Sequence, residues 1–366
     1  MNRIEVLHVV TTIERGGAEN AVLILARAQA QSGYGVAVLP LKGEPELIED
    51  FTSAGIDVNV SLLNRPILKQ LIELRKIRKR GLIVHAHLPR SELFARLAWG
   101  AGNVIFTRHN SEKFIPSMSS FFSRSLSRWV TKSAKVIAIS ESVKEFLLNS
   151  KEVRHTDQIR VIYYGFQPKN LKSSRNYPVT SSSFSHRSLR LGTISRLVPQ
   201  KNVTLLIMLA KKLMESELDF TLSIVGKGPE EETLKTLVKR NQLENHVFFL
   251  GRMRDVSNFL DNLDLFLLTS NYEGFGLVLL EAIDHNLPIV ASNTSSIPEV
   301  LSAQHPGLFE TGNLYSLQEK LEDLVNDISR RKLCLEIQRK RLNFFSISKY
   351  FSSHDELYKE VIEDFT

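Results

Sequence analysis

Short apolar runs alternate along the chain with segments that have a helical period. The first run is residues 3–10, RIEVLHVV, and a helical pattern from Ala18 to Ser32 separates it from the next run, VAVLPL. A helical pattern near Glu44 to Ala54 follows, and then the runs LIVHA, NVIFT and KVIAIS. Because these runs are almost continuously apolar, they are typical of parallel strands that are covered by helices on both faces. This part of the chain is therefore predicted to be a doubly wound α/β domain.

The alternation stops over residues 168–188, where Ser, Lys, Asn and Pro dominate. It restarts with LRLGTIS and continues through FTLSIV, HVFFL, LDLFLL and PIVAS, with helical patterns over Asn202 to Met214 and Glu230 to Arg240. A length of 366 residues also suits two domains. We predict a domain over 1–168, a linker over 169–188, a second doubly wound domain over 189–345, and a C-terminal helix over 346–366 that packs back on the first domain.

Ligands bind at the carboxyl ends of the strands in open α/β sheets. Two such Rossmann-like domains are expected to place these ends facing one another across a central cleft. The active site is therefore predicted to lie in that cleft.

The composition is that of a folded, water-soluble protein, with 43% hydrophobic and 24% charged residues. The single cysteine, Cys334, cannot form an internal disulfide, which fits a reducing cytoplasm. The N-terminal apolar run is too short for a signal peptide, and no segment approaches the roughly 18 apolar residues of a membrane-spanning helix. We expect a cytoplasmic protein.

Charge is unevenly distributed, because residues 1–175 hold 26 Lys and Arg against 15 Asp and Glu. The densest cluster is Arg75, Lys76, Arg78, Lys79 and Arg80. A basic half is compatible with a nucleic acid, an anionic membrane surface, an anionic substrate, or an ordinary solvated surface. No aromatic residues interleave the cluster, and no helix-turn-helix or zinc pattern accompanies it, so we predict no nucleic-acid partner.

The segment SNYEGFGLVLLEA carries two glutamates around a Gly-Phe-Gly turn. The pattern predicts Glu281 on a helix and Glu273 just before it. Gly274 and Gly276 let a ligand approach the backbone closely, and the amides at the start of the helix favour phosphate oxygens. Taken alone, the segment would be better explained by an exposed turn residue at Glu273 and a solvent-facing helix residue at Glu281.

Two cations lie upstream of these glutamates. The segment GTISRLVPQKNVTLL places Arg196 after a strand and Lys201 where a loop turns into a helix. A guanidinium binds phosphate bidentately and an ammonium supplies a mobile charge, so the pair could stabilise a departing diphosphate. Two solvated loop cations are the alternative for these residues taken singly.

The second half of the chain resembles the family-4 glycosyltransferases of the GT-B superfold. The matching segments are, in order, Arg196 with Lys201, VGKGPEEETL with Gly226 and Gly228, FLGRMRDV, Glu273 to Glu281, and PIVASNTSSIPEV. This ordered set spans nearly all of the second domain, whereas a lone glycine pair would be weak evidence.

The resemblance implies a role for each matching residue. Arg196 and Lys201 would contact the donor diphosphate. Glu273 would contact sugar hydroxyls, and Glu281 would hold the ribose hydroxyls. The remaining donor-binding residues implied by the resemblance are the amides of Phe275, Gly276 and Leu277 at the sugar or phosphate, and the loops at Gly226, Arg252 and Met253 beside the base.

The first half resembles the family through GGAE, VHAHLPRSELFARLA, TRHN and AISESVKEFLL. Gly16 and Gly17 either let a loop approach the donor or simply form a tight strand-to-helix turn, and the sequence leaves both open. His109 matches the family's cleft histidine, which contacts the donor sugar near the reacting carbon. A histidine can donate a hydrogen bond or move a proton near neutral pH.

Two histidines and two departures from the family pattern in this chain give weaker evidence about function. His85 and His87 have a strand spacing of two that would suit a metal, but no carboxylate or third ligand has a suitable spacing, so we interpret them as cleft-wall or core residues. Two positions depart from the family pattern. Tyr164 stands where an Asn is usual, and Ser295 and Ser296 replace a glycine pair.

The resemblance implies a retaining hexosyltransferase that moves a sugar from a nucleotide-sugar, with UDP as the default, to a glycan or lipid-diphosphate-linked acceptor in bacterial surface polysaccharide synthesis. The first domain would be the acceptor side, and the second would bind the nucleotide-sugar. No cofactor is implied, and no metal either, since no Asp-x-Asp motif precedes a strand end. A basic acceptor domain suits an anionic membrane face, so we also expect peripheral association with the inner face of the plasma membrane.

Two alternatives stay open. A sugar epimerase or phosphorylase on the same GT-B scaffold would need no sugar acceptor, and a non-catalytic partner subunit could keep the fold without the reaction. A dinucleotide-dependent oxidoreductase is disfavoured, because neither domain begins with G-x-G-x-x-G.

Overall fold

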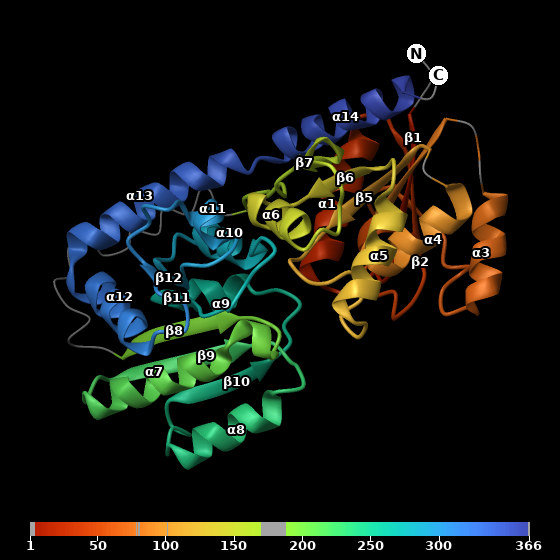
Figure 1. The fold of residues 1–366 in the computed structure, drawn as a ribbon. Coiled ribbons are helices and arrows are strands. Elements are labelled where there is room, and N and C mark those ends of the chain that lie inside the picture. The colour runs from red at the N-terminus through yellow and green to blue at the C-terminus, as the bar shows by residue number, and fades with distance from the viewer. Residues whose placement is uncertain (1–3, 78, 80, 101, 170–187, 365–366) are drawn as a thin grey trace. The chain divides into compact units, whose positions relative to one another are not determined.

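The computed structural model describes residues 4–77, 79, 81–100, 102–169 and 188–364 (Figure 1). Nearly all of the predicted linker, as well as Arg78 and Arg80 of the basic cluster, lies outside the described residues. The chain divides into two compact units. Unit 1 comprises Met1–Gln167 and Phe345–Thr366, and unit 2 comprises Pro168–Phe344.

Unit 1 is built on a seven-stranded parallel sheet in the order β3-β2-β1-β4-β5-β6-β7. Its strands are β1 (Glu5–Val10), β2 (Gly35–Pro40), β3 (Asp57–Val58), β4 (Leu82–His87), β5 (Val104–Arg108), β6 (Lys135–Ala138) and β7 (Ile159–Val161). Its helices are α1 (Gly17–Gln31), α2 (Ile48–Thr52), α3 (Ile67–Lys76), α4 (Pro89–Trp99), α5 (Ser120–Thr131), α6 (Glu141–Asn149), the 3-10 helix η1 (Thr156–Gln158) and α14 (Ile347–Glu363).

The strand order of unit 1 fixes which helices share a face. From β1 the chain adds β2 and β3 on one side, and it then returns through α3 to add β4 to β7 on the other side. Because crossovers between parallel strands are right-handed, α1 and α2 cover one face of the sheet and α3 to α6 cover the opposite face. The carboxyl ends of β1, β4 and β5 lie side by side at one edge.

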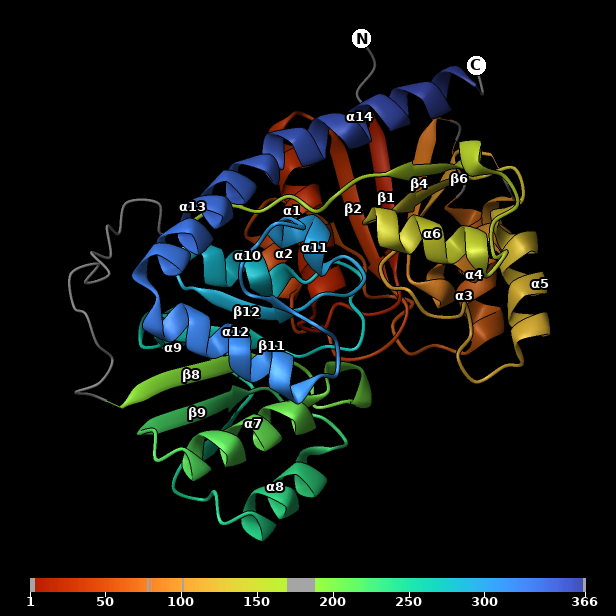
Figure 2. The ribbon, with the colours of Figure 1, turned by 60° about the vertical axis from the view of Figure 1, so that its left-hand side comes forward.

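Helix α14 belongs to unit 1, where it packs against α1 (Figure 2). The chain enters it beside the segment that follows β7, since Phe166 N–H donates to the carbonyl of Phe345 at 2.7 Å. Gly165 is in close contact with α14, and a Cβ there would lie 2.8 Å from the Cβ of Tyr350. A larger residue at position 165 would therefore push α14 away from this edge of unit 1.

Unit 2 is built on a six-stranded parallel sheet in the order β10-β9-β8-β11-β12-β13. Its strands are β8 (Leu189–Ile194), β9 (Phe220–Val225), β10 (Val247–Gly251), β11 (Leu265–Leu268), β12 (Ile289–Ser292) and β13 (Leu308–Phe309). Its helices are the 3-10 helix η2 (Pro199–Lys201), α7 (Val203–Glu215), α8 (Glu231–Arg240), α9 (Ser257–Asp261), α10 (Leu277–Asp284), α11 (Ile297–Leu301), α12 (Leu314–Asn326) and α13 (Ile328–Phe344).

The apolar runs in the sequence form the buried centre of each sheet. In unit 2, Leu191, Leu222 and Leu267 are fully enclosed and pack with α7 and α12 in one cluster. The doubly wound α/β prediction is confirmed for both parts of the chain. Within the part of the chain that the structure describes, no helix has the length and apolar character needed to cross a bilayer.

Candidate functional site

Lys201 and Glu273 meet at the carboxyl end of the unit 2 sheet. Lys201 ends η2, which follows β8, and Glu273 lies in the loop after β11. The Lys201 Nζ lies 2.5 Å from Glu273 Oε1, and the hydroxyl of Ser270 donates to the same oxygen at 2.6 Å. Glu273 is 4% exposed. Because an isolated buried charge is costly, the ion pair and the Ser270 hydroxyl compensate for the burial of the Glu273 carboxylate.

The loop that carries Glu273 ends at a glycine that the backbone requires. Gly276 has φ +88° and stands at the N-cap of α10, and its carbonyl accepts from Leu279 N–H at 2.9 Å. The amides of the first helical turn have no partner within the helix, so this end attracts anions. The hydroxyl of Ser296 donates to the Glu273 carbonyl at 3.1 Å and helps hold the loop.

Glu281 lies one turn further along α10 and is partly buried. Burial raises its pKa to about 7, although Lys169 acts in the opposite direction. The carboxyl of Glu281 is therefore close to half-ionised at neutral pH. The simple interpretation of this residue as part of a solvent face does not describe its surroundings.

Arg196 is exposed in the loop after β8, and two glycines shape that loop. Gly226 has φ +137°, and a Cβ on it would lie 1.8 Å from the carbonyl oxygen of Ser195. A Cβ on Gly228 would lie 2.2 Å from the carbonyl oxygen of Leu197. The glycines therefore let the loop after β9 press against the loop that carries Arg196. The Ser195 hydroxyl is buried and has no hydrogen-bond partner among the described residues, so it is a polar group that a ligand could satisfy.

Arg252 and Met253 lie in the loop after β10. Met253 lines a cavity of about 310 Å³ together with Ser223 and Phe259. The four residues predicted to bind diphosphate, sugar and ribose do not line this cavity. The structure thus brings Lys201 and Glu273 together, whereas Met253 borders a different space.

In unit 1, Gly16 and Gly17 form the start of α1. Gly16 is extended, and a Cβ on it would lie 2.5 Å from the Glu19 Oε2 atom. The Thr12 hydroxyl donates to Glu19 Oε1 at 2.7 Å, so the carboxylate is held over the helix start. A carboxylate is stabilised at a helix N-terminus and occupies the position that an anionic group would take. This geometry favours the tight-turn role of the two glycines.

His109 follows β5 and is partly buried. Its Nε2 lies 3.1 Å from His87 Nδ1, and its Nδ1 forms a short hydrogen bond with the Tyr164 hydroxyl. Tyr164, which departs from the family pattern, is thus a partner of the candidate cleft histidine. A sugar hydroxyl can form a hydrogen bond with His109 Nδ1 only if it displaces the Tyr164 hydroxyl.

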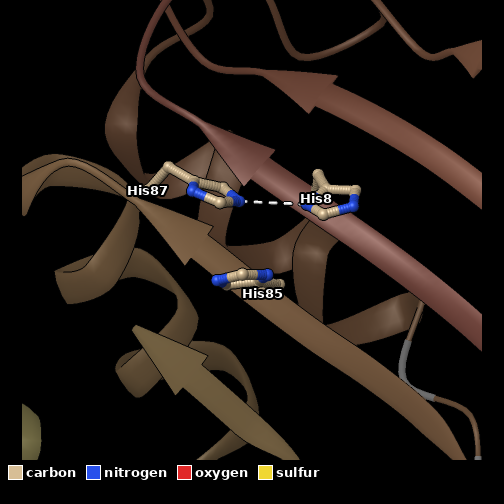
Figure 3. A group of neighbouring side chains, drawn as sticks. All are labelled: His8, His85 and His87. Carbon is tan, nitrogen blue, oxygen red and sulfur yellow. Dashed lines mark hydrogen bonds between the residues drawn. The ribbon is translucent and has the colours of Figure 1, made fainter. Parts of the chain in front are cut away.

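A chain of hydrogen bonds runs inward from His109. His87 Nε2 lies 3.0 Å from His8 Nδ1 (Figure 3), and His8 Nε2 lies 2.7 Å from Gln29 Oε1. The Gln29 amide nitrogen donates to the Tyr358 hydroxyl of α14 at 3.0 Å. The Gln29 amide oxygen can only accept, so His8 must carry its proton on Nε2. Each remaining bond of this chain then has a single donor only if His87 and His109 also carry their protons on Nε2.

The Gln29 amide also influences the hydrogen bonds of His85, through the hydroxyl of Tyr358. Because Tyr358 accepts from Gln29, its own proton is available to His85 Nδ1 at 2.7 Å. His85 then carries its proton on Nε2 and donates to the Thr107 hydroxyl at 2.6 Å. One amide orientation thus sets the tautomer of four histidines. Burial lowers the pKa of His8 to about 4 and that of His109 to about 3, so the rings are neutral near pH 7.

The three histidines of Figure 3 are the group that could hold a metal ion among the described residues. Ligand atoms of His8, His85 and His87 lie within 4.8 Å of one another. All six of their ring nitrogens already have hydrogen-bond partners, and no carboxylate belongs to the group. A bound cation would break several of these bonds and bury an uncompensated charge, so the residues fit a hydrogen-bonded core better than a metal centre.

Two family models match the chain. The model of glycosyl transferases group 1 matches residues 181–341, and the model of glycosyltransferase family 4 matches residues 15–169. N-acetyl-alpha-D-glucosaminyl L-malate synthase of Bacillus anthracis is 34% identical over 41% of this chain and 40% of its own length. The capsular polysaccharide biosynthesis glycosyltransferase CapM of Staphylococcus aureus is 25% identical over 63% of this chain and 62% of its own length.

Solved structures share the fold. The structure of Anabaena HepE in complex with UDP-glucose superposes with a TM-score of 0.80 and 20% identity, over 97% of this chain and 99% of that one. The two matched models together span most of the sequence, and both sheets are parallel and doubly wound, as predicted. The chain belongs to the family-4-like glycosyltransferases and has their GT-B fold of two doubly wound α/β units.

Proposed function

We propose that this protein is a retaining hexosyltransferase that transfers a sugar from a UDP-sugar to a glycan or lipid-diphosphate-linked acceptor during synthesis of a bacterial surface polysaccharide. The observation that carries the proposal is the Lys201–Glu273 pair, at 2.5 Å, beside the N-terminus of α10. This arrangement offers a cation and helix amides to a diphosphate, and a fixed carboxylate to neighbouring hydroxyls.

The reaction breaks the bond between the anomeric carbon and the donor phosphate oxygen. The acceptor hydroxyl attacks from the same face, forms the new glycosidic bond, and passes its proton to a phosphate oxygen of the departing UDP. Lys201 and Arg196 stabilise the negative charge that gathers on the diphosphate. Glu273 orients the sugar through its hydroxyls, and Glu281 holds the ribose.

His109 serves this reaction as a neutral ring. With its proton on Nε2, it offers Nδ1 as an acceptor to a donor-sugar hydroxyl, in exchange for the hydroxyl of Tyr164. A neutral imidazole positions the sugar without adding a charge near the anomeric carbon. The cations of unit 2 carry the electrostatic stabilisation, so we propose that the reaction needs no metal and no other cofactor.

The donor and pathway proposals draw support from the relatives. HepE was crystallised with UDP-glucose, and CapM is named for capsular polysaccharide biosynthesis. A lipid-linked acceptor also agrees with the basic character of residues 1–175. Such an acceptor would bring the protein to the inner face of the plasma membrane as a peripheral protein.

Product analysis tests the proposal. The protein is incubated with UDP-, GDP- and ADP-sugars, with and without glycan acceptors and with and without EDTA, and the anomeric configuration of the product is determined by NMR. We expect an α-linked product from an α-linked UDP-sugar, with EDTA having no effect. Lys201→Ala and Glu273→Ala should both abolish transfer.

The same experiment separates the alternatives. An epimerase would change the nucleotide-sugar without any acceptor, and a phosphorylase would require inorganic phosphate. A non-catalytic partner subunit would give no product with any donor. Each of these results would contradict the transferase proposal.

A further inference from the structure

Helix α5 of unit 1 has an inverted amphipathic pattern. Its buried face carries small polar side chains at a spacing of four residues: Ser123, Ser127 and Thr131. Its outward face carries aromatic side chains that are 63%, 61% and 44% exposed: Phe121, Phe122 and Trp129. A surface helix of a water-soluble domain normally has its apolar side chains inward and its polar side chains outward.

The polar inner face of α5 is explained by a buried charge network. Arg108 of β5 forms ion pairs with Glu92 and Glu152 at 2.8 and 2.9 Å, and it donates to the Ser127 hydroxyl at 2.9 Å. Ser127 donates in turn to the carbonyl of Glu152 at 3.1 Å. Since buried polar groups need hydrogen-bond partners, the fold requires the inner serine. It does not require three aromatic residues on the outside.

Contacts of two arginines connect α5 to α4 and α4 to α3. The guanidinium of Arg96 on α4 lies 5.6 Å from the ring centroid of Trp129, and it donates to the carbonyl of Lys132 at 3.0 Å. On the other side of α4, Arg75 of α3 donates to the carbonyl of Leu97 at 3.2 Å. Figures 1 and 2 show α3, α4 and α5 next to one another in unit 1.

We define the α3–α5 face by its exposed apolar side chains: Ile67, Leu68 and Ile72 of α3, Leu97 of α4, and Phe121, Phe122 and Trp129 of α5. Leu68 alone is 75% exposed. Val60 is the other large exposed apolar side chain of unit 1 among the described residues. Exposed apolar side chains that gather on three neighbouring helices mark a candidate interaction site.

The same three helices are basic. Their cations and those of the adjoining loops include Arg65, Lys69, Arg75, Lys76, Arg90, Arg96, Lys113, Arg124, Arg128 and Lys132. Helix α5 contains no acidic residue, and Glu73 of α3 is paired with Lys76 at 2.8 Å. Apolar anchors surrounded by cations are typical of helices that bind at the surface of anionic bilayers. Protein interfaces are likewise enriched in arginine and aromatic side chains but are depleted in lysine, and this set contains Lys69, Lys76, Lys113 and Lys132.

We propose that the α3–α5 face docks unit 1 on an anionic lipid bilayer, with Phe121 and Phe122 entering the boundary between headgroups and acyl chains. This docking rests on the proposed function in one respect only, because a lipid-linked acceptor would be the reason for the protein to bind a bilayer. Docking itself requires neither donor nor acceptor, so it can be measured independently of sugar transfer.

The two tryptophans of the chain make an intrinsic probe possible. Trp99 is 7% exposed, whereas Trp129 lies on the α3–α5 face. The full chain is mixed with vesicles of phosphatidylcholine alone or with vesicles containing about a third phosphatidylglycerol. We expect cosedimentation that is at least roughly tenfold stronger with the anionic vesicles. Tryptophan emission should shift to the blue and be quenched by lipids with brominated acyl chains.

Variants at exposed positions distinguish binding through the α3–α5 face from nonspecific binding to vesicles. Joint Phe121→Ser and Phe122→Ser substitution should weaken binding at least roughly tenfold, and joint Lys69→Glu and Lys132→Glu substitution should remove the preference for anionic lipid. Tyr315→Ser is the matched control, since Tyr315 is 76% exposed but lies on α12 of unit 2. It should bind as the unchanged protein does. Circular dichroism and thermal unfolding should be unchanged, because all of these side chains are exposed.

Three results would overturn the proposal: equal binding to both vesicle types, no binding to either, or aromatic variants that bind like Tyr315→Ser. A dimer in light scattering that the aromatic variants dissociate would also overturn it, because the face would then join two copies of the chain. Transfer to a short-chain, water-soluble acceptor keeps the two proposals apart. Transfer without vesicle binding refutes docking alone, and vesicle binding without any transfer refutes the proposed function alone.

Discussion

Donor binding should depend on the protonation of Glu281. Burial raises the pKa of this carboxyl to about 7, compared with about 4.3 for an exposed glutamate. An ionised carboxylate accepts hydrogen bonds from two ribose hydroxyls through both oxygens, whereas protonation turns one oxygen into a donor and removes the negative charge that strengthens these bonds. If Glu281 holds the ribose as proposed, the donor should bind with nearly full affinity well above pH 7 and should lose affinity as the pH falls through 7.

The size of the effect follows from the linkage between proton and ligand. If the donor binds only when Glu281 is ionised, the apparent Kd is multiplied by the factor 1 + 10^(pKa − pH). For a pKa of about 7, this factor is about 1.1 at pH 8 and roughly 30 at pH 5.5. UDP-glucose is the suitable ligand, because its diphosphate is esterified at both ends, whereas the terminal phosphate of UDP takes up a proton near pH ~6.

Isothermal titration calorimetry at a series of pH values, in buffers with different ionisation enthalpies, measures both the affinity and the protons released. Glu281→Gln keeps the shape of the side chain and removes the titration. It should bind roughly tenfold more weakly at pH 8, because charge-assisted hydrogen bonds are lost, and its affinity should not vary with pH. A flat profile for the unchanged protein, or the same slope in Glu281→Gln, would refute the reasoning.

Four further predictions concern the remaining parts of the two units. Lys201→Met leaves a buried carboxylate without its partner, so urea denaturation should show a free energy of unfolding lower by about 3 kcal/mol; a loss below about 1 kcal/mol would contradict the burial of that charge. Gly226→Ala places a Cβ 1.8 Å from a carbonyl oxygen at φ +137° and should prevent stable folding of unit 2, as followed by circular dichroism. Gly33→Ala, with φ +88° and open space around it, should cost only about 1 kcal/mol. The carboxylate in Gln29→Glu can only accept, so the Tyr358 hydroxyl should donate to it and should accept from His85, whose proton then moves from Nε2 to Nδ1. Nitrogen-15 NMR of the histidine rings measures this, and a His85 that stays protonated on Nε2 would contradict the prediction.

The long central elements of both units could be predicted from the sequence. The run FTLSIV is β9, and the predicted helix from Asn202 to Met214 is α7, shifted by one residue. These elements are recognisable because strands that are covered on both faces are apolar throughout. The strands β3 and β13, of two residues each, have no such signal, since their pairing depends on the neighbouring strand.

The Lys201–Glu273 pair of unit 2 was predictable in part. Lys201 and Glu273 each follow a strand, and the carboxyl ends of β8 and β11 are neighbours, so their proximity follows from the strand order. The supporting hydroxyls of Ser270 and Ser296 were missed, because single serines in loops have no periodic signal. Ser296 occupies a position where the family usually has glycine, and the structure gives it a hydrogen bond to the Glu273 carbonyl.

The histidine cluster was missed for a different reason. His85 and His87 have no third histidine close to them in sequence, because His8 is on another strand. In the parallel pairing of β1 with β4, His8 lies opposite His85. Correct strand pairing would have brought the three rings together, and it shows why histidines from distant positions can form one hydrogen-bonded core.

Acceptor-dependent transfer of a radiolabelled sugar from a UDP-sugar to a lipid-diphosphate-linked acceptor is the most direct test of the proposed activity. The unchanged protein should form labelled glycolipid and release UDP in equal amounts, and Lys201→Ala and Glu273→Ala should each reduce the rate by at least roughly a hundredfold. Transfer at an unchanged rate in both variants, or no transfer from any nucleotide-sugar to any acceptor, would contradict the proposal that this charged pair serves a glycosyltransferase.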